Sequence, residues 1–330
     1  MLRILHGTNY DFIKWWRLMV AITVAFIVLG TGMVVTRAVQ GRPAINKSIE
    51  FSGGTLVQLK FARPPGDQSL RETVEKAGFG HAEIQQFGTP LEYTVRARLG
   101  EGEVTAAQGD STSKQIRAAL IAKYGQTGVT VLRSEFVGPR VGDELQTNAI
   151  IAILISFAVT LIYLAIRFEW RFGLAAVVAT AHDTITTIAF ITIMHLEVSL
   201  TVVAAILTVI GYSLNDTFII FDRVRENLRK QRRESLRDVL NRSINETLPR
   251  SIMTHMTTLA ATVALLLFAG EVIRPFSWVM TFGIFTGTFS SIYVAGALLL
   301  WIEHKWPRET DKGTSRALAA ERREGAGATN

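Results

Sequence analysis

The chain has 330 residues, 48% of them hydrophobic and 19% charged, with a formal net charge of +7 and no cysteine. This composition excludes disulfides, cysteine-based zinc sites and iron–sulfur clusters. Long uncharged runs alternate with charged stretches, which is typical of membrane proteins. Because much of the basic excess flanks the apolar runs, it favours attraction to anionic lipid at the cytoplasmic face over binding of nucleic acid.

The first apolar run occupies residues 18–35, between Arg17 and Arg37. At 1.5 Å per residue it would span about 27 Å, close to the thickness of one hydrocarbon core. The apolar core of a cleaved signal peptide is shorter, about 7–15 residues. The sequence therefore predicts an uncleaved transmembrane helix at 18–35, after a cytoplasmic N-terminus at 1–17.

Residues 36–146 contain no segment that could span a membrane. Tyr93, Val95 and Ala97 alternate with polar neighbours, the two-residue period of a strand. The order of such segments predicts a β-α-β-β-α-β domain of the ferredoxin-like type. The expected elements are strands at Ser48–Phe61, Ala82–Phe87, Glu92–Leu99 and Val129–Phe136, and helices at Gln68–Ala77 and Ser113–Tyr124.

Five further apolar runs predict transmembrane helices 2–6 within residues 147–301, and their flanks set the topology. Nine Lys and Arg residues lie between positions 223 and 250, whereas the links 195–199 and 270–277 contain none and one. The positive-inside rule therefore predicts that both termini are cytoplasmic and that residues 36–146 are extracytoplasmic. The runs are expected at Thr147–Ile166, Phe172–Met194, Leu200–Phe221, Ile252–Ala269 and Trp278–Trp301.

Two charged segments are predicted to lie outside the bilayer on the cytoplasmic side. The link 222–250 is expected to form a basic amphipathic helix on the membrane surface. The tail 302–330 is expected to be disordered, because its end is rich in Ala, Gly and charge. The apolar side of the link helix would comprise Val224, Leu228, Leu236, Val239, Leu240 and Ile244.

Ionisable groups within the spans are the candidate functional residues, because burying a charge in a bilayer is costly. Asp216 lies six residues, or about 9 Å, inside Asp222 at the cytoplasmic boundary. Arg250 begins the fifth helix, from which its long side chain could reach Asp216 directly or through water. Burial favours the protonated carboxyl and a nearby arginine favours the carboxylate, so a proton site is predicted. A fixed interhelical hydrogen bond is the alternative. The candidate proton relay comprises Asp216, Arg250, Asn215, Thr254, Thr257 and Thr258.

Two more intramembrane features carry predictions. Asp183 and His182 lie close to mid-membrane in the third helix and form a candidate secondary polar site, for which a functional and a structural role are equally open. His255, at a helix end, is interpreted as structural. Small residues recur every four positions in the last helix, which predicts close packing against another helix in this chain or in a partner. They are Gly283, Gly287, Ser291 and Ala295.

The sequence contains no phosphate-binding loop, no metal-ligand cluster at useful spacing and no nucleophile motif. No enzyme activity, cofactor or metal site is therefore predicted, and energy for work would come from an ion gradient. The pair Gly53–Gly54 is interpreted as a bulge or a close backbone approach.

Several stretches, in order along the chain, resemble the SecD/SecF family of bacterial protein-export membrane proteins. The likeness runs from about residue 8 to residue 305. It departs at Ser251 and His255, where the family usually has Thr and Ser. The matching stretches are Ile49–Thr55, Val137–Gly142, Gly211–Thr217, Phe221–Asn227, Arg250–Leu259 and Ser290–Val294.

This resemblance implies a polytopic α-helical protein of the bacterial inner membrane with the fold of the RND superfamily, in which two six-helix halves pack around a pseudo-two-fold axis. The chain would supply one half and SecD the other, with YajC, YidC and the SecYEG channel as further partners. It also implies use of the proton-motive force to complete preprotein translocation after SecA has acted. The family's membrane carboxylate falls on Asp216 and its arginine on Arg250.

Two other functions stay open on the residues alone. An RND-type exporter of small molecules or lipids would share the fold, although such chains typically carry both halves. A non-transporting membrane scaffold would explain the topology but would leave Asp216 without a role.

Overall fold

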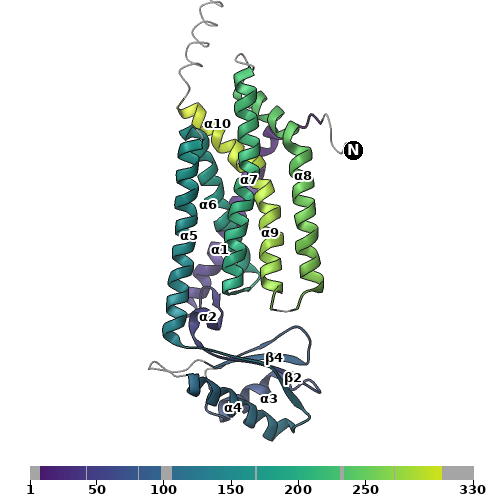
Figure 1. Ribbon diagram of the computed structural model, residues 1–330. Coiled ribbons are helices and arrows are strands. Elements are labelled where there is room, and N and C mark those ends of the chain that lie inside the picture. The colour runs from purple at the N-terminus through teal and green to yellow at the C-terminus, as the bar shows by residue number, and fades with distance from the viewer. Residues whose placement is uncertain are drawn as a thin grey trace, which may run out of the picture.

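The computed structural model describes residues 8–306 except for 42, 81, 98–105, 168, 231–233 and 271. A bundle of long helices stands on a small α+β domain (Figure 1). Within the described residues, six helical segments are long and apolar enough to cross a membrane. They are Ile13–Val39, Arg140–Leu164, Trp170–Ile193, Leu200–Lys230, Leu236–Phe268 and Arg274–Lys305.

The helices of the bundle are close to those expected, and most extend beyond the predicted ends. The bundle comprises α1 (Trp16–Val39, after a short 3-10 turn η1 at Ile13–Trp15), α5 (Pro139–Arg167), α6 (Trp170–Ile193), α7 (Leu200–Lys230), α8 (Leu236–Phe268), α9 (Arg274–Ser290), a π-helical turn η2 (Ser291–Ala295) and α10 (Gly296–Lys305). The last three elements together make the sixth span.

The α+β domain has the predicted ferredoxin-like topology. Its elements run in the order β2 (Gly54–Phe61), α3 (Asp67–Lys76), β3 (Glu83–Gln86), β4 (Glu92–Ala97), α4 (Ala106–Tyr124) and β5 (Val129–Val137). The strands form an antiparallel sheet in the order β3-β4-β2-β5, and α3 and α4 cover the face that lies away from the bundle (Figure 1). Alternate residues of β2 and β4, such as Val57, Leu59 and Val95, are buried against Leu70 and Leu120 of these helices. This confirms the predicted β-α-β-β-α-β order.

The first strand of this domain begins later than predicted. Residues Ile49–Ser52 form a single helical turn, α2, and β2 starts only at Gly54. Gly53 and Gly54 have φ of 67° and 119°, which breaks the extended backbone expected from Ser48 onward. The N-terminal turns of α5 approach this point closely, because a Cβ on Gly142 would lie 3.0 Å from the Gly53 nitrogen. The glycine pair is therefore a close backbone approach, and the strand irregularity lies elsewhere, between Gln58 and Leu59.

The centre of the bundle is formed by α6, α7 and α9. In the most apolar windows of α6, α7 and the sixth span, which comprises α9, η2 and α10, 61%, 56% and 67% of residues are buried, against 11% for the first span, 6% for α5 and 17% for α8. Small residues allow this close packing: a Cβ on Gly283 would lie 2.7 Å from Val209 Cγ1 and one on Gly287 would lie 3.0 Å from Ser213 Cβ. The small-residue stripe of the last helix therefore packs against α7 of the same chain.

The link between the fourth and fifth spans is not the separate surface helix that was predicted. Residues 222–230 continue α7, and residues 236–250 are the first turns of α8, which runs through Pro249 without ending. The predicted apolar side is correct, but it packs inside the protein: Val224, Val239 and Ile244 are buried in the core of the bundle. An amphipathic helix can bury its apolar face against lipid or against protein, and here the second occurs.

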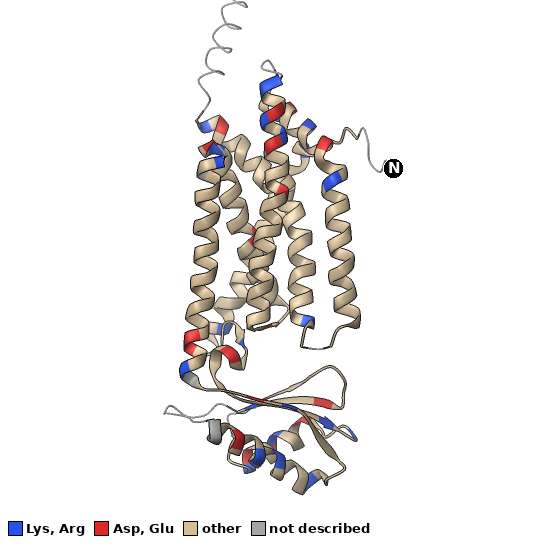
Figure 2. Cartoon of the chain, in the orientation of Figure 1, with Lys and Arg blue, Asp and Glu red and all other residues tan. Residues whose placement is uncertain are grey.

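Charged residues gather at the two ends of the bundle and are nearly absent from its middle (Figure 2). The start of α1 and the end of α10 lie at the end opposite the α+β domain (Figure 1).

The N-terminal segment is fixed to α8 by Asn245. The Asn245 side chain donates to the Tyr10 carbonyl and accepts from the Tyr10 amide, each at 2.9 Å. α10 continues to Lys305, so the prediction of a disordered tail from residue 302 is wrong for residues 302–305. Residues 307–330 lie outside the described part of the chain.

Candidate functional site

Asp216 lies on the buried side of α7, facing α8. The residue is 3% exposed, and its Oδ1 accepts a hydrogen bond of 2.5 Å from the Ser251 hydroxyl. Its Oδ2 is buried and has no hydrogen-bond partner among the described residues. A carboxyl with one bonded and one unbonded oxygen can accept a proton on the second without breaking an existing hydrogen bond.

Arg250 does not pair with Asp216 in this structure. Its side chain is exposed, and within the described residues no ion pair joins the two groups. Successive residues of a helix are about 100° apart, so when Ser251 faces Asp216, Arg250 points toward the outside of the bundle. The direct pair considered from the sequence is therefore replaced here by the hydroxyl of Ser251.

The other residues of the predicted relay line the outer side of the α7–α8 pair. Asn215, Thr254 and Thr257 are exposed, and Thr258 is half-buried. Each threonine hydroxyl donates to a carbonyl of its own helix, Thr254 to Arg250 at 2.9 Å for example. These residues therefore lie on the same two helices as Asp216 and Ser251. Among the described residues, none of them forms a hydrogen bond to the Asp216 carboxyl.

His255, which was interpreted as structural and departs from the family pattern, belongs to the buried side of α8. It is 7% exposed, its Nδ1 lies 2.5 Å from the Ser251 carbonyl oxygen, and its ring meets Tyr212 edge-on at 5.1 Å. The Tyr212 hydroxyl lies 2.9 Å from the Thr254 carbonyl oxygen. Together with Asp216 and Ser251, these rings make a compact polar contact between α7 and α8.

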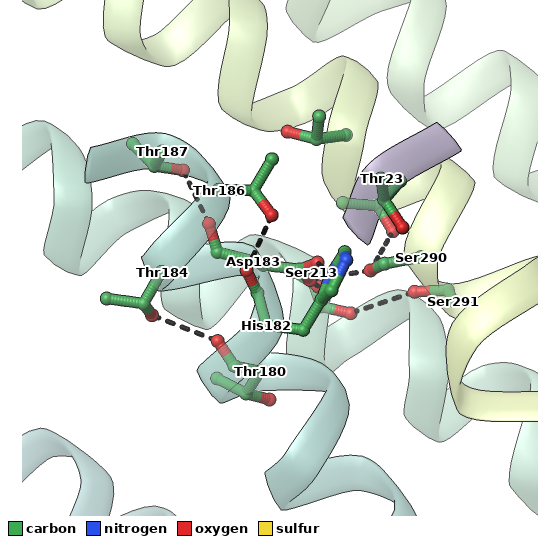
Figure 3. A network of polar contacts seen from close by, with 12 residues as sticks. Thr23, Thr180, His182, Asp183, Thr184, Thr186, Thr187, Ser213, Ser290 and Ser291 are labelled. Carbon is green, nitrogen blue, oxygen red and sulfur yellow. Dashed lines mark hydrogen bonds and ion pairs between the residues drawn. The ribbon is translucent and has the colours of Figure 1, made fainter. Parts of the chain in front are cut away.

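A second polar site surrounds Asp183 at the centre of the bundle (Figure 3). Asp183 is fully buried, and its Oδ2 accepts hydrogen bonds from Ser213 of α7 at 2.5 Å and Ser290 of α9 at 2.6 Å. Its Oδ1 lies 3.0 Å from Nδ1 of His182. Three helices thus meet at one carboxyl. Beside it, Thr217 and Ser291 join α7 to η2 through their hydroxyls at 2.8 Å.

Three serines of these sites were missed by the sequence analysis: Ser213, Ser251 and Ser290. What could have pointed to them is that each serine lies at about the same depth in the membrane as a carboxyl on a neighbouring helix. The depth of a serine can be estimated by counting residues from the end of its helix. The side of the helix on which it lies cannot be estimated in this way, because that depends on how the helices pack.

The link between α6 and α7 connects the bundle to the α+β domain. Its two-residue strand β6 (Glu197–Val198) pairs in parallel with β1 (Asn46–Lys47), and Glu197 forms an ion pair with Arg96 of β4. At the start of α7, the Leu200 amide donates to Glu50 at 2.6 Å. Burial raises the pKa of the Glu197 carboxyl and Arg96 opposes the shift in part, so Glu197 takes up a proton at higher pH than an exposed glutamate.

These features define a polytopic membrane protein with a bundle of six spans among the described residues and a ferredoxin-like domain inserted after its first helix. Residues 117–305 match the family described as protein export membrane protein SecD/SecF, C-terminal. The chain is 60% identical to protein translocase subunit SecF of Gemmatimonas aurantiaca, over 97% of this chain and 95% of that protein. It is 36% identical to SecF of Escherichia coli O157:H7, over 93% and 94%.

Two solved structures share the fold. SecDF of Thermus thermophilus, described as a translocon-associated membrane protein, is 34% identical with a TM-score of 0.79, covering 92% of this chain and 40% of that chain. A SecDF structure in a super-membrane-facing form is 35% identical with a TM-score of 0.65, covering 94% and 41%. The chain thus spans about two fifths of the SecDF chains that it matches. It belongs to the SecD/SecF family, among the protein translocase subunits named SecF.

Proposed function

We propose that this chain is the SecF half of a SecD–SecF assembly that uses the proton-motive force to complete preprotein translocation through SecYEG after SecA has acted. The observation that supports this most directly is Asp216. It is a carboxyl within a membrane-spanning helix, 3% exposed, bonded by Ser251 on one oxygen and without a partner on the other among the described residues. Intramembrane carboxyls of this kind commonly serve as proton sites.

Protonation of Asp216 would change how strongly α7 is held to α8. A hydrogen bond to a charged group contributes about 1.5–3 kcal/mol and a neutral one about 0.5–1.5 kcal/mol. Moving one proton through a potential of 100 mV supplies about 2.3 kcal/mol. The two energies are similar, so one proton suffices to favour a second arrangement of α7. Arg250, one residue from Ser251, would pair with the carboxylate once that proton is released.

Movement of α7 would reach the α+β domain through the link that begins this helix. The link pairs with β1, and its Glu197 binds Arg96 in the sheet. It adds a non-covalent connection to the two covalent ones, after α1 and before α5. In the proposed cycle this contact stays closed and transmits the movement, and the domain draws the preprotein outward.

A disulfide between β1 and β6 tests this connection in a chain that has no cysteine of its own. Lys47 and Val198 are paired residues of the two strands, and we expect Lys47→Cys with Val198→Cys to cross-link under oxidation while gradient-stimulated translocation continues at the wild-type rate. Each single cysteine is the matched control. If the cross-link stops translocation and a reductant restores it, the contact must open during the cycle and does not transmit movement as a closed link.

The proposed SecD partner would cover the weakly packed side of the bundle formed by α7 and α8. On α7 the exposed residues Thr208, Gly211 and Asn215 are small or polar and follow one another at spacings of three and four. Such stripes allow close approach of a second helix and hydrogen bonds across it. The exposed Thr254 and Thr257 of α8 extend the same polar character.

Gly211→Leu tests this face. A Cβ on Gly211 meets no atom within 4 Å, so the substitution leaves the packing of this chain intact. We expect the variant to insert normally but to recover much less SecD in affinity purification from mild detergent. Val159→Leu on α5, which is 59% exposed, is the control at a lipid-facing site. Wild-type recovery of SecD with Gly211→Leu would place the partner on another face.

We further propose the orientation given by the positive-inside rule, with both termini cytoplasmic and residues 36–146 periplasmic. The gathering of Lys and Arg at the bundle end opposite the α+β domain supports it (Figure 2). That end would also contact anionic lipid. YajC, YidC and SecYEG are proposed as further partners on the strength of the family.

The experiment that tests the function is preprotein translocation into inverted membrane vesicles, with and without this chain at equal amounts of SecD. We expect an imposed proton gradient to stimulate translocation only when the chain is present, while the ATP-driven part is the same in both. Equal stimulation without the chain would contradict the proposal. Loss of small-molecule resistance together with normal translocation would favour an exporter.

A further inference from the structure

His182 and Asp183 form a hydrogen-bonded pair at the point where α6, α7 and α9 meet (Figure 3). Asp183 is fully buried, and the His182 side chain is 13% exposed. Both hydroxyls that reach Oδ2 of Asp183, from Ser213 and Ser290, donate to it. While both hydroxyls donate, the two lone pairs of Oδ2 are occupied, and that oxygen has no place for a proton. Proton exchange in this pair therefore concerns Oδ1 and the imidazole of His182.

One proton is needed between Oδ1 of Asp183 and Nδ1 of His182, which lie 3.0 Å apart. With that proton alone the pair carries one negative charge, whichever atom holds it. The remaining nitrogen, Nε2 of His182, is buried and has no hydrogen-bond partner among the described residues. A second proton on Nε2 makes the pair neutral and breaks no existing hydrogen bond.

We propose that the His182–Asp183 pair is a second proton-binding site of the membrane domain, which takes up and releases a proton at Nε2 of His182. The step adds one proton to an anionic pair and yields a neutral pair, without any other change in bonding. Because an uncompensated charge is costly at this depth of a bilayer, the protonated pair is the stable resting form, and deprotonation is the step that needs a favourable gradient.

Few other charges act on this site. On α7, Asp216 lies one helical turn from Ser213, and its carboxyl faces α8. In the sequence, α1 has no titratable side chain between Arg17 and Arg37, and between Arg274 and Glu303 the last span has only Tyr293, whose ring packs on Phe12 and Phe289. On α5 none occurs between Glu144 and Tyr163, which packs on Phe218.

The geometry connects the two sites through α7. Ser213 binds Asp183 of α6, and Asp216, three residues later, binds Ser251 of α8. These residues are separated by about 4.5 Å along the helix. α7 is therefore held from two sides by hydrogen bonds to carboxyls, so a change of charge at either site acts on this helix. This inference rests on the proposed function for its use in export, but the proton site itself does not depend on it.

The direct test is nitrogen NMR of the full-length chain in detergent or nanodiscs with labelled histidine imidazoles, His182 being assigned from the signal lost in His182→Gln. We expect Nδ1 of His182 to stay protonated while Nε2 changes from deprotonated to protonated as the pH is lowered from about 9 to 4. An Nε2 signal that keeps one state throughout would overturn the proposal. This measurement uses the wild-type fold and needs no translocation.

The functional arm compares pH profiles of gradient-stimulated translocation for wild type, His182→Gln and Ser290→Ala. Removing the proton site with His182→Gln should shift the profile, whereas Ser290→Ala keeps both proton-binding atoms and should alter the rate more than its pH dependence. An unshifted His182→Gln profile would overturn a role of this site in export. If wild type itself shows no gradient stimulation, the proposed function fails, and the NMR result stands alone.

Discussion

Asp216→Asn should abolish the gradient-stimulated part of preprotein translocation while leaving insertion and SecD binding unchanged. Asparagine has nearly the size of aspartate, and its carbonyl oxygen can accept the hydrogen bond that Ser251 donates at 2.5 Å. It cannot bind or release a proton near neutral pH. The measurement is the translocation rate into inverted vesicles with and without an imposed proton gradient, at equal expression.

Asp222→Asn is the matched control for this prediction. Asp222 lies six residues further along α7, is exposed, and pairs with Arg167 at 3.3 Å at the end of the bundle. Exposed ion pairs contribute about 0–1 kcal/mol, so its loss should leave gradient stimulation intact. If Asp216→Asn keeps full stimulation, its carboxyl is a structural group, and the scaffold alternative gains support. If both variants lose it, negative charge along α7 matters more than a proton site.

The number and order of the spans could be predicted from the sequence because bilayer thickness fixes the length of an apolar run. The ferredoxin-like order could be predicted for a similar reason, since alternation at Tyr93, Val95 and Ala97 matches a half-buried strand. These features depend on local periodicity, which every window of the sequence carries. They were predicted correctly except near their ends.

The predicted ends of the fourth and fifth spans were wrong because an amphipathic pattern fits both a membrane surface and a packed protein core. Val224, Val239 and Ile244 were correctly placed on one apolar side, but amphipathicity alone does not distinguish a helix on the membrane surface from the extension of two packed helices. Asn227 of α7 and Ser243 of α8 show what decides it, because their side chains bond at 3.0 Å within the protein. That contact joins residues on two helices and is invisible in a window along one.

Of the two polar sites, the sequence predicted the buried carboxyls but not their hydrogen-bond partners. A charged residue within an apolar run is evident in the sequence, and both Asp183 and Asp216 are buried as expected for such groups. Their partners depend on helix rotation. A turn of about 100° separates Arg250, the partner considered from the sequence, from Ser251, the one found. Tertiary packing sets that rotation, and no local property of α8 specifies it.

Gly283→Ala should destabilise the bundle by about 1–3 kcal/mol, the usual cost of overpacking a core. The added Cβ would lie 2.7 Å from Val209 Cγ1 and 3.1 Å from Val209 Cβ, and a β-branched side chain has little freedom to move away. α7 and α9 would have to separate at this contact, one turn along α7 from Ser213, which donates to Asp183. The measurement is the free energy of unfolding in mixed micelles by denaturant titration.

Two further variants identify the cause. Gly211→Ala adds the same methyl group to α7 where no atom lies within 4 Å, so it should be neutral or slightly stabilising through helix propensity. Val209→Ala removes the two methyl groups that the new Cβ meets, and combined with Gly283→Ala it should recover most of the lost stability. The double-mutant cycle then gives a coupling energy of opposite sign to the single losses. If the two losses are additive, Gly283→Ala destabilises the protein through its effect on the backbone of α9 and not through contact with Val209.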